Sequence, residues 1–139
     1  MANLNYDSMM SDSANGNITF GTNTFYAMLV SSTYTPNKKT HTKRSDVTNE
    51  VVGAGYTADG QATTVTVTLD TVNARCDISF SDVTWPTSTI TARAAVVYRH
   101  RGGASSADEL VSYADFGSNT STTGGTFTLD FTGPLRFQN

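Results

Sequence analysis

The sequence predicts an all-β protein: an antiparallel β-sandwich, jelly-roll or immunoglobulin-like, with an extended N-terminal arm and at most one short helical turn. Three observations predict it. Short segments that alternate apolar and polar residues recur between turn residues, and none has the pattern of a ten-residue helix. The chain contains 24 threonines, which are β-branched and favour strands. Its 139 residues suit one domain with one hydrophobic core.

Residues 1–17 are predicted to form a polar arm that precedes a single domain over residues 18–139. Their apolar residues recur with neither the period of a strand nor that of a helix, and Asn15-Gly16 is a turn signal. Such a segment is either a frayed terminus or an arm that becomes ordered against a neighbouring molecule.

The first strands are predicted on both sides of Gly21. Residues 18–20 form a short alternating piece that ends at this glycine. Residues 25–30, Phe-Tyr-Ala-Met-Leu-Val, are a continuous apolar run of strand length, which is typical of a central strand buried on both faces. A long polar connection is expected over residues 31–44.

One helical turn is predicted after this connection. Ser45 or Asp46 has the side chain of an N-cap, and Gly53 is suited to end the turn. The glycines at 53, 55 and 60 then indicate turns before the next strand.

The clearest strand pattern covers residues 64–70, Thr-Val-Thr-Val-Thr-Leu-Asp. Because successive side chains of a strand point to opposite faces, Val65, Val67 and Leu69 are predicted on one face and the threonines on the other. Pro86 is expected to close the strand that follows, since proline cannot donate to a central ladder. Further strands are predicted at residues 76–80, 90–98, 109–116 (ending at Gly117), 127–131 and 134–137.

Residues suited to catalysis are few and show no motif. His41 and His100 are the only histidines, each in a hydrophilic segment, and the G-x-S-x-G motif is absent. A single cysteine, Cys76, excludes an intrachain disulfide and a cysteine zinc cluster. The sequence therefore predicts a protein that is not an enzyme and uses no metal ion or other cofactor.

Positive charge is concentrated in one short segment. Lys38, Lys39, Lys43 and Arg44 surround His41, which leaves five basic residues against twelve acidic ones elsewhere in the chain. Such separation can steer an acidic protein partner. A solvated loop that only preserves solubility is the equally weighted alternative. The net charge of −3 argues against direct nucleic-acid binding, and no apolar run is long enough for a membrane.

Trp85, the only tryptophan, has two interpretations. A lone tryptophan in a β-domain commonly fills the core between the sheets. The alternative is an exposed ring that stacks on a sugar or joins an interface, which makes Trp85 a candidate partner-binding residue.

Several strings of this sequence resemble a family of small structural proteins of tailed bacteriophages. The likeness covers about residues 18–132, and its most specific parts are Arg-Ser-Asp-Val-Thr-Asn-Glu at 44–50 and Val-Thr-Trp-Pro at 83–86. Further parts lie at residues 25–30, 34–36, 40–41, 55–56, 88–93 and 114–117.

The resemblance implies a virion component without catalytic residues. Capsid decoration is the preferred role: the protein would bind the major capsid protein of the assembled shell, associate with itself as a dimer or trimer, and lie on the capsid surface. Without a signal peptide it would be made in the host cytoplasm. The alternative role is a tail- or fibre-associated module that binds host glycan.

Overall fold

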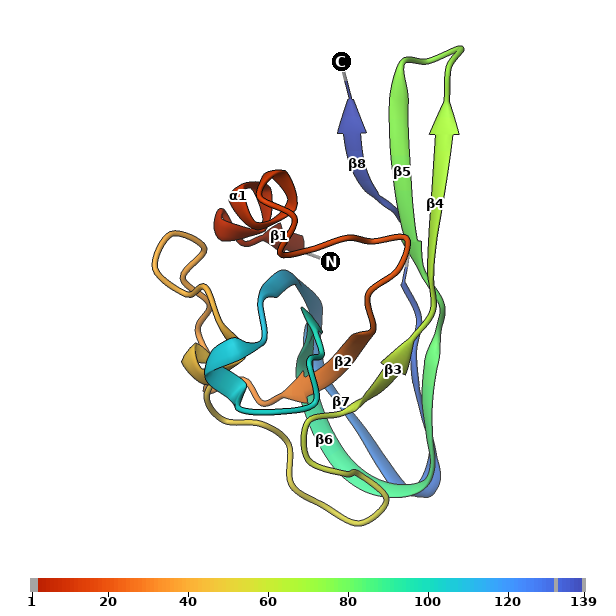
Figure 1. Cartoon of the computed structure of the whole chain (residues 1–139). Coiled ribbons are helices and arrows are strands. Elements are labelled where there is room, and N and C mark those ends of the chain that lie inside the picture. The colour runs from red at the N-terminus through yellow and green to blue at the C-terminus, as the bar shows by residue number, and fades with distance from the viewer. Residues whose placement is uncertain (1–2, 132, 139) are drawn as a thin grey trace.

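The computed structural model describes residues 3–131 and 133–138, and within them eight strands form two antiparallel sheets (Figure 1). The larger sheet has the strand order β1-β7-β6-β2-β3, and the smaller one the order β4-β5-β8. The predicted all-β sandwich is confirmed. The strands are β1 (Asn3–Asn5), β2 (Phe25–Val30), β3 (Gln61–Thr63), β4 (Val65–Asp70), β5 (Arg75–Phe80), β6 (Val83–Arg99), β7 (Leu110–Leu129) and β8 (Leu135–Gln138); the helices are α1 (Ser8–Ala14) and the 3₁₀ turns η1 (Arg44–Asp46) and η2 (Ser105–Ala107).

Strands β6 and β7 are far longer than the sequence predicted, because bulges bend them instead of ending them. Pro86 lies in a bulge between the Trp85–Phe127 and Ser88–Gly125 pairs, where a missing N–H does not interrupt the ladder. Gly117, with a φ of +84°, lies in a second bulge of β7. The predictions that Pro86 and Gly117 end strands are therefore wrong.

Strand β2 is central and buried on both faces, as predicted. Ala27 and Leu29 join a large apolar cluster that extends to the smaller sheet, whereas Met28 and Val30 join a second cluster on the opposite face. The connection predicted over residues 31–44 is a loop as far as Lys43, because η1 begins at Arg44, and its Tyr34 belongs to the second cluster.

The prediction of a separate arm is wrong for residues 3–17. Strand β1 pairs with β7, and α1 follows at once. Tyr6 is fully buried and its hydroxyl lies 2.9 Å from that of Tyr34, while Met9 belongs to the large cluster. These apolar residues are too sparse to make a periodic pattern, but each one fills a gap in the domain.

Two local predictions also need correction. Residues 18–20 form no strand, although Ile18 and Phe20 are buried in the large cluster. The predicted helical turn is present as η1, but Ser45 and Asp46 lie inside it and Lys43 precedes it. The Asp46 carboxylate accepts hydrogen bonds from the backbone N–H groups of Thr42 and Lys43.

Candidate protein-binding surface

The smaller sheet has one apolar face and one polar face. On the apolar face, Leu69 of β4 lies opposite Cys76 of β5, and Cys76 lies opposite Phe137 of β8. Val67 and Ile78 form the next pair of this face. The two-faced pattern predicted for residues 64–70 is therefore confirmed, with Val67 and Leu69 on the same side.

The polar face is held together by ion pairs. Arg136 of β8 donates to both carboxylate oxygens of Asp77 in β5, at 2.6 and 3.0 Å. This hydrogen bonding lowers the pKa of Asp77 below its usual value. Asp70 accepts from the backbone N–H groups of Val72 and Asn73 and so fixes the turn between β4 and β5. The sheet is thus ordered by contacts that leave its apolar face free.

Half of this apolar face is uncovered. Near the body, Ile78 and Leu135 are only 1% and 7% exposed and belong to the large cluster. Farther along, the strands rise beyond the rest of the molecule (Figure 1), and the same face reaches solvent. We call this outer part, with the turn that closes it, the tip face: Val67 (46% exposed), Leu69 (71%), Phe137 (40%) and the intermediate Cys76 on the strands, and Val72 (91%) in the turn between β4 and β5.

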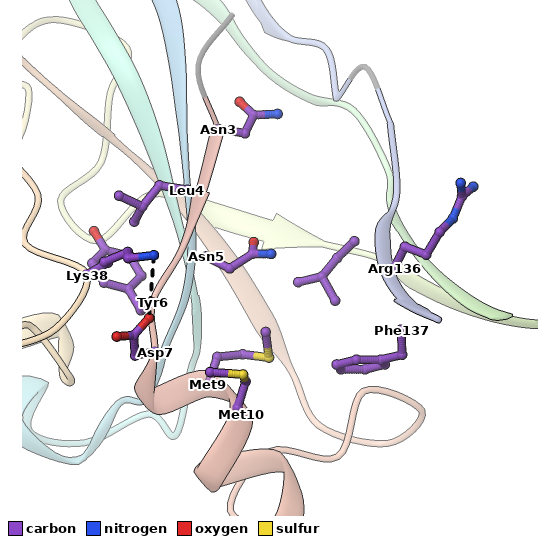
Figure 2. Close-up of a pocket in the computed structure, with 11 residues that line it drawn as sticks. Asn3, Leu4, Asn5, Tyr6, Asp7, Met9, Met10, Lys38, Arg136 and Phe137 are labelled. Carbon is purple, nitrogen blue, oxygen red and sulfur yellow. Dashed lines mark ion pairs between the residues drawn. The ribbon is translucent and has the colours of Figure 1, made fainter. Parts of the chain in front are cut away.

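A groove of about 500 Å³ adjoins the tip face. It separates β8 from β1 and the start of α1, and Figure 2 shows Met9 and Met10 on one side and Phe137 on the other. Met10 is 61% exposed, and the Lys38 ammonium lies 4.0 Å from the Asp7 carboxylate at the rim. Because β1 and β8 are edge strands, the groove lies between two sheet edges.

Two members of the predicted basic segment form ion pairs within the domain. Arg44 donates to Asp108 at 2.8 Å and to Asp59 at 2.5 Å, and its guanidinium lies 5.2 Å from the centre of the Tyr98 ring. Lys43 lies 3.6 Å from the buried carboxylate of Glu109. These cations neutralise acidic groups of the domain, which gives them an internal role, and their binding to a partner stays a prediction.

The remaining members of the segment are accessible to different degrees. Lys38 belongs to the groove rim, and Lys39 is exposed. His41 Nδ1 lies 2.9 Å from the Tyr34 hydroxyl, which ties this ring to the loop. The structure therefore does not bring the five predicted residues together as one positive patch.

Trp85 is fully buried, which confirms its core interpretation and contradicts the sugar-stacking one. Its ring lies 5.7 Å from that of Tyr56 and 6.1 Å from that of Phe127. Burial of this large ring anchors the start of β6 in the core.

The titratable groups around Tyr56 form a structural network. The Tyr56 hydroxyl donates to Glu50 at 2.5 Å, and the same carboxylate accepts from the backbone N–H of Asp59. Burial raises the pKa of Glu50, and burial together with the Glu50 hydrogen bond raises that of Tyr56. The Tyr56 hydroxyl also accepts from the backbone N–H of Leu29, so the network ties the loop over residues 50–60 to β2.

Metal-ligand clusters and membrane-spanning helices are both absent from the described part of the chain. Over residues 3–131 and 133–138, no three His, Cys, Asp or Glu side chains are grouped so that they could hold a metal ion. In the same residues, no helix has the length and apolar character needed to cross a membrane.

The second histidine of the sequence, His100, stacks on Tyr26, with ring centres 3.9 Å apart.

Fold and surface together define an all-β sandwich from which a three-stranded sheet projects with an uncovered apolar face. Comparison with protein-family models, with curated proteins and with solved structures found no match.

Sequence reasoning missed the exposed residues Leu69, Val72, Phe137 and Met10. The alternation in residues 64–70 was the available signal, because it predicts an apolar face. An alternating pattern does not reveal whether that face is covered, which depends on the position of the whole sheet.

Proposed function

We propose that this protein is a non-enzymatic structural component of a tailed-phage virion that binds the assembled shell of the major capsid protein as a decoration protein. The resemblance of residues 18–132 to small structural phage proteins supports a virion role. The observation that carries the proposal is the groove, a cleft between two sheet edges that is lined by apolar side chains such as Met10 and Phe137 and by polar ones such as Asn3 and Asn5. Such a site suits an extended protein segment.

The bound segment would be an extended stretch of a capsid subunit. Its backbone would pair with the outer edge of β8, and an apolar side chain would enter between Met10 and Phe137. At the rim, the Lys38 ammonium and the Asp7 carboxylate offer the segment one positive and one negative group with which to pair.

Binding of this kind stabilises a shell by mass action. A ligand that binds the assembled subunits and not the free ones shifts the equilibrium toward the assembled state. The effect is repeated at every occupied position, so moderate affinity at each groove suffices for a stable particle.

The test compares shells with and without the purified protein. Wild-type protein is expected to bind shells and raise the temperature at which they disrupt. Met10→Asp, which places a charge in the groove at an exposed position, should lose binding. Ser11→Asp is the matched control, because Ser11 is an exposed neighbour on α1 outside the groove lining. Equal heat resistance of decorated and undecorated shells would refute the decoration role.

The alternative role as a tail- or fibre-associated module assigned glycan binding to Trp85. That side chain is buried, so no observation favours this alternative over decoration. A particle reconstruction separates the two: decoration places copies over the head surface, whereas density confined to the tail would favour the alternative.

A further inference from the structure

We propose that the tip face is a self-association site, where two copies of this chain pack face to face about a two-fold axis. The inference goes beyond the proposed function, because it concerns the purified chain alone and does not require a capsid. It follows from the exposure, the area and the charge of one surface.

The area of the tip face matches what a dimer needs. The exposed fractions of Val67, Leu69, Val72 and Phe137 sum to about two and a half residues. With roughly 150 Å² for each residue, the lowest area that an aromatic side chain buries, the tip face offers about 370 Å² of apolar surface. Two such faces bury roughly 740 Å², and since about 60% of an interface is apolar, the total is about 1,200 Å², the lower bound for stable complexes.

Charge favours a second copy over an acidic or basic partner. Among the described residues of the tip face, the only ionisable group is the thiol of Cys76. The charges of this sheet lie on its other face, where Arg136 and Asp77 neutralise each other. Two chains, each with a net charge of −3, can therefore meet here without bringing like charges together.

The symmetry of the contact follows from where the apolar side chains point. Antiparallel pairing of two β4 edges would extend the sheet but leave Leu69 and Phe137 in water. Face-to-face packing covers both, with sheets about 10 Å apart as in a sandwich. A contact of one surface with its own copy closes on itself around a two-fold axis and yields a dimer.

The test measures the mass of the purified full-length chain in solution by sedimentation. Wild-type protein is expected to have twice the chain mass of 14.8 kDa at micromolar concentration. Leu69→Asp should sediment as a monomer. Because Leu69 is 71% exposed on a projecting strand, the variant should keep its fold, which circular dichroism checks.

Thr66→Asp is the matched control. Thr66 is exposed on the same strand but on the polar face, opposite Ser79, so the same charge added there should leave the dimer intact. A monomeric wild-type protein would overturn the inference. So would a dimer that persists in Leu69→Asp, or an assembly of three or more copies.

Cross-linking locates the contact independently. Cys76 is the only cysteine and belongs to the tip face, so a short bis-maleimide should join two wild-type chains. It should not join two Leu69→Asp chains. If wild-type dimers form without this cross-link, they meet through another surface and the inference fails. Loss of shell binding by Met10→Asp tests the groove alone, so the two proposals can fail separately.

Discussion

Replacing Arg44 with methionine is expected to destabilise the fold, although the sequence places this residue in a candidate binding segment. Its guanidinium is the partner of Asp108, which is fully buried, and of Asp59. Methionine keeps most of the aliphatic volume but removes every donor. Asp108 would then keep the hydrogen bond from the backbone N–H of Arg101 and lose its charged partner.

The size of the expected loss in folding stability follows from the burial of Asp108. Removing one member of a buried ion pair typically costs about 3–5 kcal/mol, because the other charge stays buried without compensation. A domain of this size has about 5–15 kcal/mol of stability in total. At roughly 3–4 °C per kcal/mol, the midpoint of thermal unfolding should fall by about 10–20 °C.

Urea unfolding followed by the fluorescence of the buried Trp85 measures this cost. Adding Asp108→Asn to Arg44→Met should recover part of the loss, since the orphaned charge is then removed. Lys39→Met is the control: Lys39 is exposed, so its effect should stay within about 0.5 kcal/mol. An Arg44→Met midpoint equal to that of the wild type would refute the internal role.

Three further changes test the fold. Gly60→Ala should cost several kcal/mol or prevent folding, because φ is +82° and the new Cβ would lie 1.9 Å from the Ala27 carbonyl oxygen; a wild-type melting temperature would contradict this. Tyr6→Ala should lower the free energy of unfolding by about 3–5 kcal/mol, whereas a detachable arm would give no change. Burial raises the pKa of Glu109, but the hydrogen bonds and the positive charges of Lys43 and Arg101 together lower it further, so the net pKa lies below 4.5. The stability that Glu109 contributes should therefore be present above pH 4.5 and fall as the pH drops below it. Glu109→Gln should flatten that fall in urea titrations at pH 3–7, and an unchanged slope would contradict it.

The local pattern of apolar and polar residues was sufficient to predict strands in which each face keeps the same character along the strand. The apolar run at residues 25–30 predicts a strand buried on both faces, and the alternation at residues 64–70 predicts a two-faced one; both are present. Bulges escape such reasoning, because Pro86 and Gly117 end a strand in most contexts but bend one here.

The candidate site could not be predicted because it depends on distant partners. Arg44 meets Asp108 across 64 residues of sequence, so a segment that looks free and basic is partly internal. Met10 and Phe137 line one groove from opposite ends of the chain. Spacing along the sequence carries no information about either contact.

Phe137 connects the two proposed surfaces, because it lines the groove and also belongs to the tip face. Phe137→Ala should therefore weaken both dimer formation and shell binding, whereas Leu69→Asp and Met10→Asp each weaken only one. The side chain is 40% exposed and packs near Phe20, with ring centres 6.4 Å apart, so a thermal melt must first confirm that the variant folds. Sedimentation and shell binding are then measured on the same sample. If Phe137→Ala impairs only dimer formation or only shell binding, Phe137 does not take part in both contacts. The unaffected contact is then made by another part of the molecule.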